Sequence, residues 1–221
     1  MANPPPPVKK KGLGCCGCGC LILALLAILL IALVGGGGYL AYTNFLKITT
    51  TSPDAIPTFD GGDDVYNRAL QKLKAFNHDA ENHLAATIRL NADEINTLIA
   101  RNPNFTNNHI LLYVTLTDDQ ARVQTSVPTA IFTNSALKGR FLSGDVSFSV
   151  SFNADTKNLS LDLKSLKVGS IDAPESDLPA IQAETDPALN QLLKKDPDFE
   201  AVLNQATSIQ IKDSELVIET K

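Results

Sequence analysis

Cysteine is missing from residues 21–221, and acidic residues are missing from residues 1–47. Without cysteine, the long C-terminal part owes nothing to disulfides and has no thiol nucleophile. The chain also lacks a Gly-x-Ser-x-Gly elbow and a phosphate-cradling glycine loop. We therefore expect a protein that is not an enzyme and that holds no cofactor.

Charge of either sign is missing from Gly12 to Leu46, a stretch of 35 residues that follows Lys9, Lys10 and Lys11. Its centre, from Leu21 to Val34, is an unbroken apolar run. With its flanks, the stretch exceeds the roughly 20 residues that cross about 30 Å of hydrocarbon. It predicts a transmembrane helix over residues 20–42. The lysines place the Pro/Lys/Cys tail, residues 1–19, in the cytoplasm and the C-terminal part outside the plasma (inner) membrane.

A cleavable secretory signal is the competing interpretation of the same stretch. Two features favour a retained anchor: the apolar character continues through Tyr39 to Tyr42, and no A-x-A cleavage sequence is present. A lipoprotein signal fits less well, because its modified cysteine would follow the apolar run.

Four cysteines, Cys15, Cys16, Cys18 and Cys20, cluster at the predicted cytoplasmic end of the span. They allow a zinc or copper(I) site, acylation, or simple packing of small residues. Zinc usually takes paired C-x-x-C knuckles separated by a loop, and that loop is absent here. Packing is the favoured interpretation.

The sequence after the span divides into a tether, residues 43–62, and one domain, residues 63–221. The tether is rich in Thr, Ser, Pro, Asp and Gly. After residue 47 there are 15 Lys and Arg against 24 Asp and Glu, a formal charge of −9. Such an acidic surface argues against nucleic acid as a partner, and against a broad basic contact with anionic lipid.

Periodicity predicts the first elements of the domain. A helix begins at Asp63 or Asp64 and ends near Asn77, and a strand follows over residues 85–90. Asn91 and Glu94 approximate a capping box for a second helix, which Pro103 stops.

The middle of the domain alternates as β-structure. We expect hairpins over residues 110–127 and 146–163, with a bulge near Ser165 where the alternation slips by one residue. Three helices then begin near prolines, over Pro174–Ala183, Pro187–Lys194 and Pro197–Ala206, before a closing hairpin over residues 209–218. The fold class expected is α+β, a curved antiparallel sheet packed on one face by helices.

The strand-to-helix junction from Ile88 to Ile99 and the exit from Val168 to Pro174, in this order of elements, resemble YpmS-type bacterial membrane-anchored proteins. The resemblance covers roughly residues 45–221. It implies a curved sheet outside the membrane and assigns no catalytic residue.

Three groups of residues are candidates for sites of chemistry. His78, Asp79, Glu81 and His83 are metal-type ligands, but an i, i+5 histidine spacing does not place both rings on one helical face. Asp118 with Asp119, and Asp196 with Asp198, could be paired carboxylates, but both pairs fall at predicted turns or helix starts, where Asp is expected.

The remaining interpretation is a single-pass, membrane-anchored structural or protein-interaction module of the cell envelope. It predicts an exposed apolar patch or an unpaired edge strand. The alternative is a domain that binds or transfers a lipid or another apolar ligand in a cavity. The expected lining of that cavity is Phe141, Phe148, Phe152 and Leu161.

Overall fold

A computed structural model describes residues 48–131, 139–195 and 197–221. The predicted span over residues 20–42, the tail and the four cysteines lie outside the described residues. No helix within the described ranges is long and apolar enough to cross a membrane.

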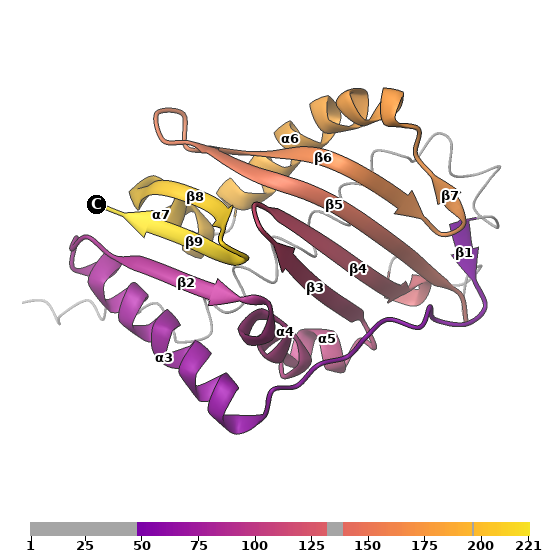
Figure 1. Ribbon diagram of the computed structural model, residues 1–221, viewed down its shortest axis with the longest axis horizontal. Coiled ribbons are helices and arrows are strands. Elements are labelled where there is room, and N and C mark those ends of the chain that lie inside the picture. The colour runs from indigo at the N-terminus through magenta and orange to yellow at the C-terminus, as the bar shows by residue number, and fades with distance from the viewer. Residues whose placement is uncertain (1–47, 132–138, 196) are drawn as a thin grey trace, which may run out of the picture.

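Two antiparallel sheets form the domain (Figure 1). The larger sheet has the strand order β3-β4-β5-β6-β7, with β1 paired to the start of β5. The smaller sheet has the order β2-β9-β8. The strands are β1 (Thr49–Thr50), β2 (Thr87–Asn91), β3 (Leu111–Thr117), β4 (Gln120–Pro128), β5 (Phe141–Asn153), β6 (Asn158–Val168), β7 (Ile171–Asp172), β8 (Ala206–Lys212) and β9 (Glu215–Thr220).

Helices pack against both sheets, so the class is α+β as predicted. One helix, α3, lies beside β2, and α6 follows the β6 side of the larger sheet (Figure 1). The helices are α3 (Gly62–Glu81), α4 (Ala92–Ala100), α5 (Pro103–Thr106), α6 (Leu178–Lys195) and α7 (Pro197–Gln205), with short 3₁₀ turns at Thr129–Ile131 and Glu175–Asp177.

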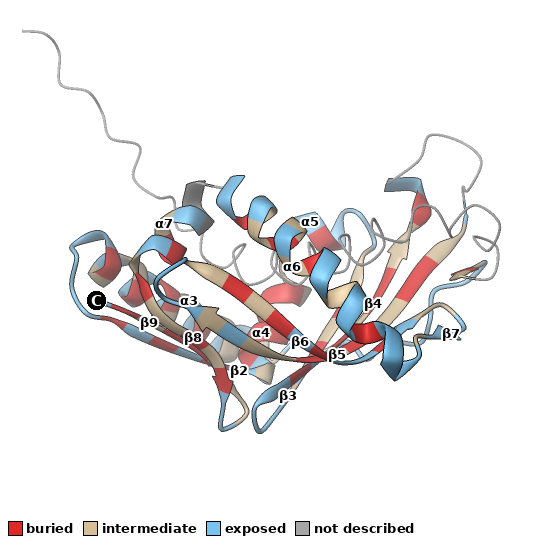
Figure 2. Ribbon diagram, turned by 90° about the horizontal axis from the view of Figure 1, so that it is seen from above, coloured by how far each residue is buried: buried red, intermediate tan, exposed pale blue. Residues whose placement is uncertain are grey.

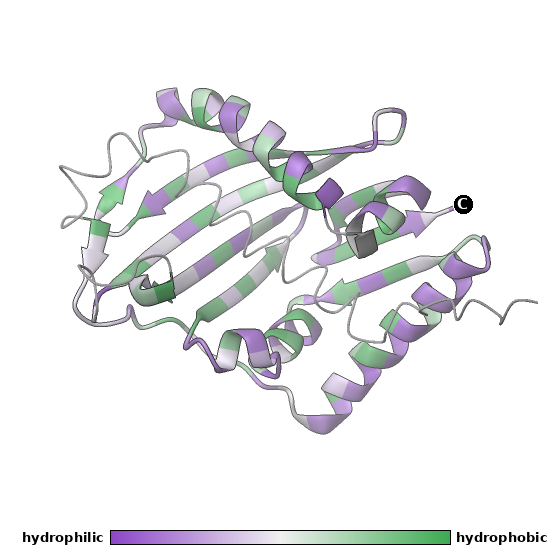
Figure 3. Ribbon diagram, turned by 180° about the vertical axis from the view of Figure 1, so that it is seen from behind, coloured by the Kyte–Doolittle hydropathy of each residue, from purple (hydrophilic) through white to green (hydrophobic). Residues whose placement is uncertain are grey.

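Alternation along the long strands produces the core. Polar and apolar side chains alternate along β4, β5 and β6, and the buried positions alternate in the same way (Figures 2 and 3). Val123, Val146 and Phe148 are at most 2% exposed, as expected for one face of a sheet turned inward. This inner face belongs to a single hydrophobic core shared with the helices.

The bulge lies where the sequence predicts it. Ser147 pairs with Ser165 and the next residue of β5, Phe148, pairs with Leu163, so Lys164 is the extra residue on β6. The bulge restores the inward direction of Leu166, which is buried.

The predicted capping box of α4 is confirmed. The Glu94 N–H donates to Asn91 Oδ1 at 2.9 Å, and the Asn91 N–H donates to Glu94 Oε2 at 3.2 Å. Although Glu94 is 1% exposed, Lys72 Nζ reaches its carboxylate at 2.8 Å, so the buried charge is paired.

The predicted break at Pro187 is wrong. One helix, α6, runs through Pro187, which lacks the N–H that would bond the Ala183 carbonyl. The helix continues because Leu189 and Leu193, on the far side of the proline, are fully buried. The helix predicted from Pro174 begins instead as a 3₁₀ turn, and α3 extends four residues beyond Asn77.

Part of the segment predicted as a tether belongs to the sheet. Thr49 and Thr50 pair with Leu142 and Phe141 of β5. Arg140 holds β1 in this position. Its Nε donates to Thr49 Oγ1 at 2.7 Å, and its Nη2 donates to the Thr49 carbonyl at 2.6 Å.

Candidate functional site

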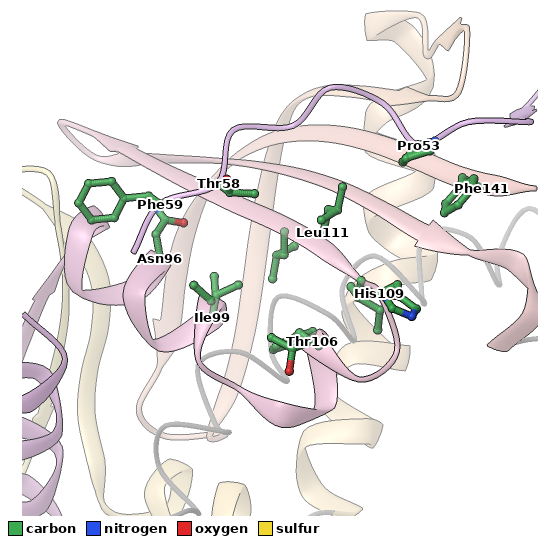
Figure 4. A pocket seen from close by; sticks show the side chains of 13 residues that line it. Pro53, Thr58, Phe59, Asn96, Ile99, Thr106, His109, Leu111 and Phe141 are labelled. Carbon is green, nitrogen blue, oxygen red and sulfur yellow. The ribbon is translucent and has the colours of Figure 1, made fainter. Parts of the chain in front are cut away.

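A pocket of about 580 Å³ lies between α4, α5, the start of β3 and the extended chain that precedes α3 (Figure 4). We call it the α4–β3 pocket. Its lining is Pro53, Thr58, Phe59, Asn96, Ile99, Ala100, Phe105, Thr106, His109, Ile110, Leu111, Leu112 and Phe141.

The inner wall forms because α4 is fastened alongside β3. The side chain of Asn96 bonds both backbone groups of Val114, at 2.7 and 2.8 Å. After α4, Pro103 at the first position of α5 turns the chain so that the Phe105 carbonyl accepts the Ile110 N–H at 3.0 Å. Phe105 and Ile99 are thereby buried beside the first residues of β3.

The outer wall, residues 53–60, is held by its C-terminal end. The Gly61 N–H donates to Thr97 Oγ1 at 2.9 Å. Arg101, just after α4, donates from Nε to both carboxylate oxygens of Asp60 at 3.1 Å and from Nη1 to Asp63 at 2.6 Å. Its guanidinium also lies 4.9 Å from the centre of the Tyr66 ring.

These contacts shift two protonation equilibria in the direction that keeps the wall in place. Hydrogen bonds from the Arg101 side chain, and then from the Gly62 N–H, lower the pKa of the Asp60 carboxyl from its ordinary value. Bonds to Asp60 and Asp63 raise the pKa of Arg101. The ion pair is therefore charged on both sides at neutral pH.

The lining of the pocket is mostly apolar. Nine of its 13 residues are apolar, and none is Asp, Glu, Lys, Arg, Ser or Cys. Its one titratable side chain, His109, is exposed at the rim, as are Pro53, Thr58 and Thr106. Catalytic clefts bring several ionisable groups together, whereas this pocket offers apolar surface.

One backbone position in the pocket wall lacks a partner. The N–H and C=O of Val114 both bond the side chain of Asn96, which shows that they point away from β4. Backbone direction alternates along an antiparallel strand, so the N–H and C=O of Leu112 point to the same open side, and Leu112 lines the pocket. Across the described ranges, neither group of Leu112 has a hydrogen-bond partner.

The four residues expected to line a cavity are not brought together at this pocket. Phe141 lines it, at its β5 side. Phe148 and Leu161 are each 2% exposed within the hydrophobic core, and Phe152 is partly buried against that core.

The candidate chemical groups lie at the end of a helix and in a turn. His78, Asp79 and Glu81 lie in the last turns of α3, while His83 follows the helix. Asp118 and Asp119 form the exposed β3–β4 turn, and Asp196 lies outside the described residues. No group of three or more His, Cys, Asp or Glu that could hold a metal occurs among the residues that the structure describes.

A second pocket, of about 490 Å³, is polar. Its charged residues balance in sign: Arg122, Lys164 and Lys167 against Asp145, Asp172 and Glu175. Arg122 Nε donates to Asp145 at 2.9 Å, and this pairing raises the pKa of Arg122. The pocket thus presents no excess charge for an ionic ligand.

The sequence alone does not mark Ile99, Phe105 or Leu111 as site residues. Ile99 is one of the buried residues of α4, and the side chain of Leu111 lies on the opposite face of β3 from that of the buried Leu112. An outward-facing leucine on an edge strand is the one sequence signal that points to this pocket. Comparisons of the chain with protein-family models, with curated proteins and with solved structures find no match to any of the three.

Proposed function

We propose that this chain is a membrane-anchored protein-interaction module whose extracytoplasmic domain binds an apolar segment of another protein in the α4–β3 pocket. The observation that carries the proposal is the lining: nine apolar residues, an exposed rim and a single titratable group. Apolar surface of this kind marks protein-interaction sites and ligand-binding grooves.

The location belongs to the same proposal. Residues 20–42 cross the plasma membrane, residues 1–19 remain in the cytoplasm, and the curved sheet with its helices lies outside. Protease added to intact cells should then remove the domain and leave the tail. Intact mass of the mature protein distinguishes this arrangement from a cleaved signal, because cleavage would remove the four cysteines.

A lipid or another apolar ligand is the second candidate. The volume of about 580 Å³ supports it, since small-molecule sites usually measure about 300–1,000 Å³. An acyl chain, however, would displace water from the Leu112 backbone groups and offer them no partner, which costs free energy.

Binding measurements on the full-length chain in lipid nanodiscs test the proposal. The probes are a fluorescent library of hexapeptides, alternately apolar and polar with flanking lysines, and a fluorescent dodecanoyl chain. Leu111→Asp and Phe141→Asp place a carboxylate in the pocket, and each should weaken peptide binding by about tenfold or more.

The matched control is Leu84→Asp. Leu84 is 54% exposed after the end of α3 and does not line the pocket, so the same chemical change should leave binding intact. Binding of the dodecanoyl probe alone would transfer the function to lipid. Peptide binding that Leu111→Asp and Phe141→Asp leave unchanged would contradict the pocket as its site.

A further inference from the structure

We infer that the partner binds by adding a short β-strand to the open edge of β3, through the N–H and C=O of Leu112. This inference rests on the proposed function and specifies its partner as an extended peptide segment with an apolar centre and a basic flank.

The unpaired backbone at Leu112 determines the kind of occupant. A residue at a sheet edge presents one donor and one acceptor at fixed spacing, and a peptide backbone in β-conformation matches both. Peptide strands added in this way gain main-chain hydrogen bonds from the edge and specificity from side-chain pockets. An acyl chain has neither a donor nor an acceptor along its length.

The free edge is short because both of its ends are closed. On one side, two residues along β3, the N–H and C=O of Val114 are already bonded to the Asn96 side chain. On the other, the Ile110 N–H is bonded to the Phe105 carbonyl. The added strand therefore pairs fully with one residue of β3, and affinity must come largely from side chains.

The side chain opposite Leu112 falls within the apolar lining. In an antiparallel pair, opposed side chains share one face of the sheet, and the Leu112 side chain is buried on the core face. The partner residue thus projects toward the side on which α4 packs, where Ile99 and Phe105 form the wall. An apolar residue is favoured at this position and a charged one is excluded.

The charge of the domain favours a basic residue beside the apolar centre of the bound peptide, and the distance from the predicted span indicates where the peptide comes from. Asp54 follows the lining residue Pro53 in the chain and is exposed, and the sequence after residue 47 carries a formal charge of −9. A lysine or arginine next to the apolar centre complements this field. Pro53 follows the predicted span by 11 residues, a reach of at most about 40 Å, so the pocket lies within reach of juxtamembrane segments of other anchored proteins.

N-methylation of the best-binding hexapeptide tests the inference on the full-length chain in nanodiscs. A methyl group removes one backbone donor and keeps the apolar character. In strand addition, methylation at the amide facing Leu112 should weaken binding by about tenfold, while methylation at the two adjacent amides, which face away, should have little effect.

Amide hydrogen exchange supplies an independent readout. The Leu112 amide should become protected when peptide binds, whereas the Val114 amide, already bonded to Asn96, should keep its protection. Equal effects of methylation at every position, or an unprotected Leu112 amide in the complex, would overturn strand addition while leaving pocket binding standing. Binding of no peptide would overturn the proposed function as well.

Discussion

The side-chain amide of Asn96 replaces a neighbouring strand for Val114: Nδ2 donates to the Val114 carbonyl at 2.7 Å, and Oδ1 accepts the Val114 N–H at 2.8 Å. The opposite side of the larger sheet has the same device. Asn190 of α6 donates to the Leu159 carbonyl at 2.7 Å and accepts the Leu159 N–H at 2.8 Å. Side chains from helices therefore bond the backbone groups of Val114 on β3 and Leu159 on β6, so these groups cannot pair with a strand of another chain. The backbone groups of Leu112 have no such protection from any residue in the described ranges.

Asn96→Ala should destabilise the domain by about 2–4 kcal/mol. Asn96 is 2% exposed, so the substitution leaves the N–H and C=O of Val114 in a site that water reaches poorly. Urea unfolding of the full-length chain in nanodiscs measures the change. Asn67→Ala, on the exposed face of α3, is the matched control and should change the stability by at most about 0.5 kcal/mol. Equal stabilities for the two variants would contradict the role given to Asn96.

Asn190→Ala should loosen the β6 edge by about 1–2 kcal/mol and accelerate exchange of the Leu159 amide. The cost is smaller than at Asn96 because Asn190 is only half-buried and water can replace part of the interaction. The Leu161 amide, which Asp186 accepts at 3.1 Å, should keep most of its protection. Gln191→Ala, exposed on the same helix, controls for the loss of an amide and should leave Leu159 exchange unchanged.

Signals confined to a few neighbouring residues predicted their elements correctly. The capping box at Asn91 and Glu94 is complete within four residues, and the bulge at Lys164 follows from the change of phase between Leu163 and Leu166. In both cases, the residues that determine the local geometry are close neighbours in the sequence, so the pattern can be recognised without knowing the rest of the fold.

Pro187 shows where local reasoning fails. The proline costs one helical hydrogen bond, and from sequence this favours a break. Burial of Leu189 and Leu193, together with the hold of Asn190 on β6, outweighs that cost. Those contacts depend on where β6 lies, and local periodicity does not contain this information.

The α4–β3 pocket could not be predicted for the same reason. Its walls come from residues 53–59, 96–100 and 105–112 and from Phe141, and the order of strands brings them together. Asn96 stands beside the apolar stripe of α4 and gives no sign in the sequence that it will bond an edge strand. The open direction of the Leu112 backbone groups is set by the register between β3 and β4.

Acid should weaken the outer wall of the pocket through Asp60. Bonds from Arg101 and from the Gly62 N–H hold the pKa of Asp60 below 3.8, its ordinary value and the one expected for the unfolded chain. A carboxyl with a lowered pKa in the fold stabilises it above that ordinary value, and the stabilisation is lost as the pH falls toward the lower, folded pKa. The wild-type chain should therefore lose more stability below about pH 4 than Asp60→Asn does.

Thermal unfolding of both proteins between pH 2 and pH 6 measures this difference. Asp54→Asn is the control, because Asp54 is exposed and makes no ion pair with any residue in the described ranges. Its pH profile should follow that of the wild type. Coinciding wild-type and Asp60→Asn profiles would show that the Arg101 pair does not form in solution.

Gly169→Ala should be among the most damaging single-methyl additions in this domain, at about 2–4 kcal/mol. Gly169 has a φ of 58°, which costs an alanine about 1–2 kcal/mol. A Cβ there would also lie 2.5 Å from the carbonyl oxygen of Ile48, a backbone atom that cannot move without displacing β1. Gly62→Ala separates the two effects, since Gly62 has a φ of 81° and nothing lies within 4 Å of its Cβ position. Gly62→Ala should cost about 1–2 kcal/mol. Comparable losses of unfolding free energy in the two variants would mean that the backbone at Ile48 does not pack against the β6–β7 turn.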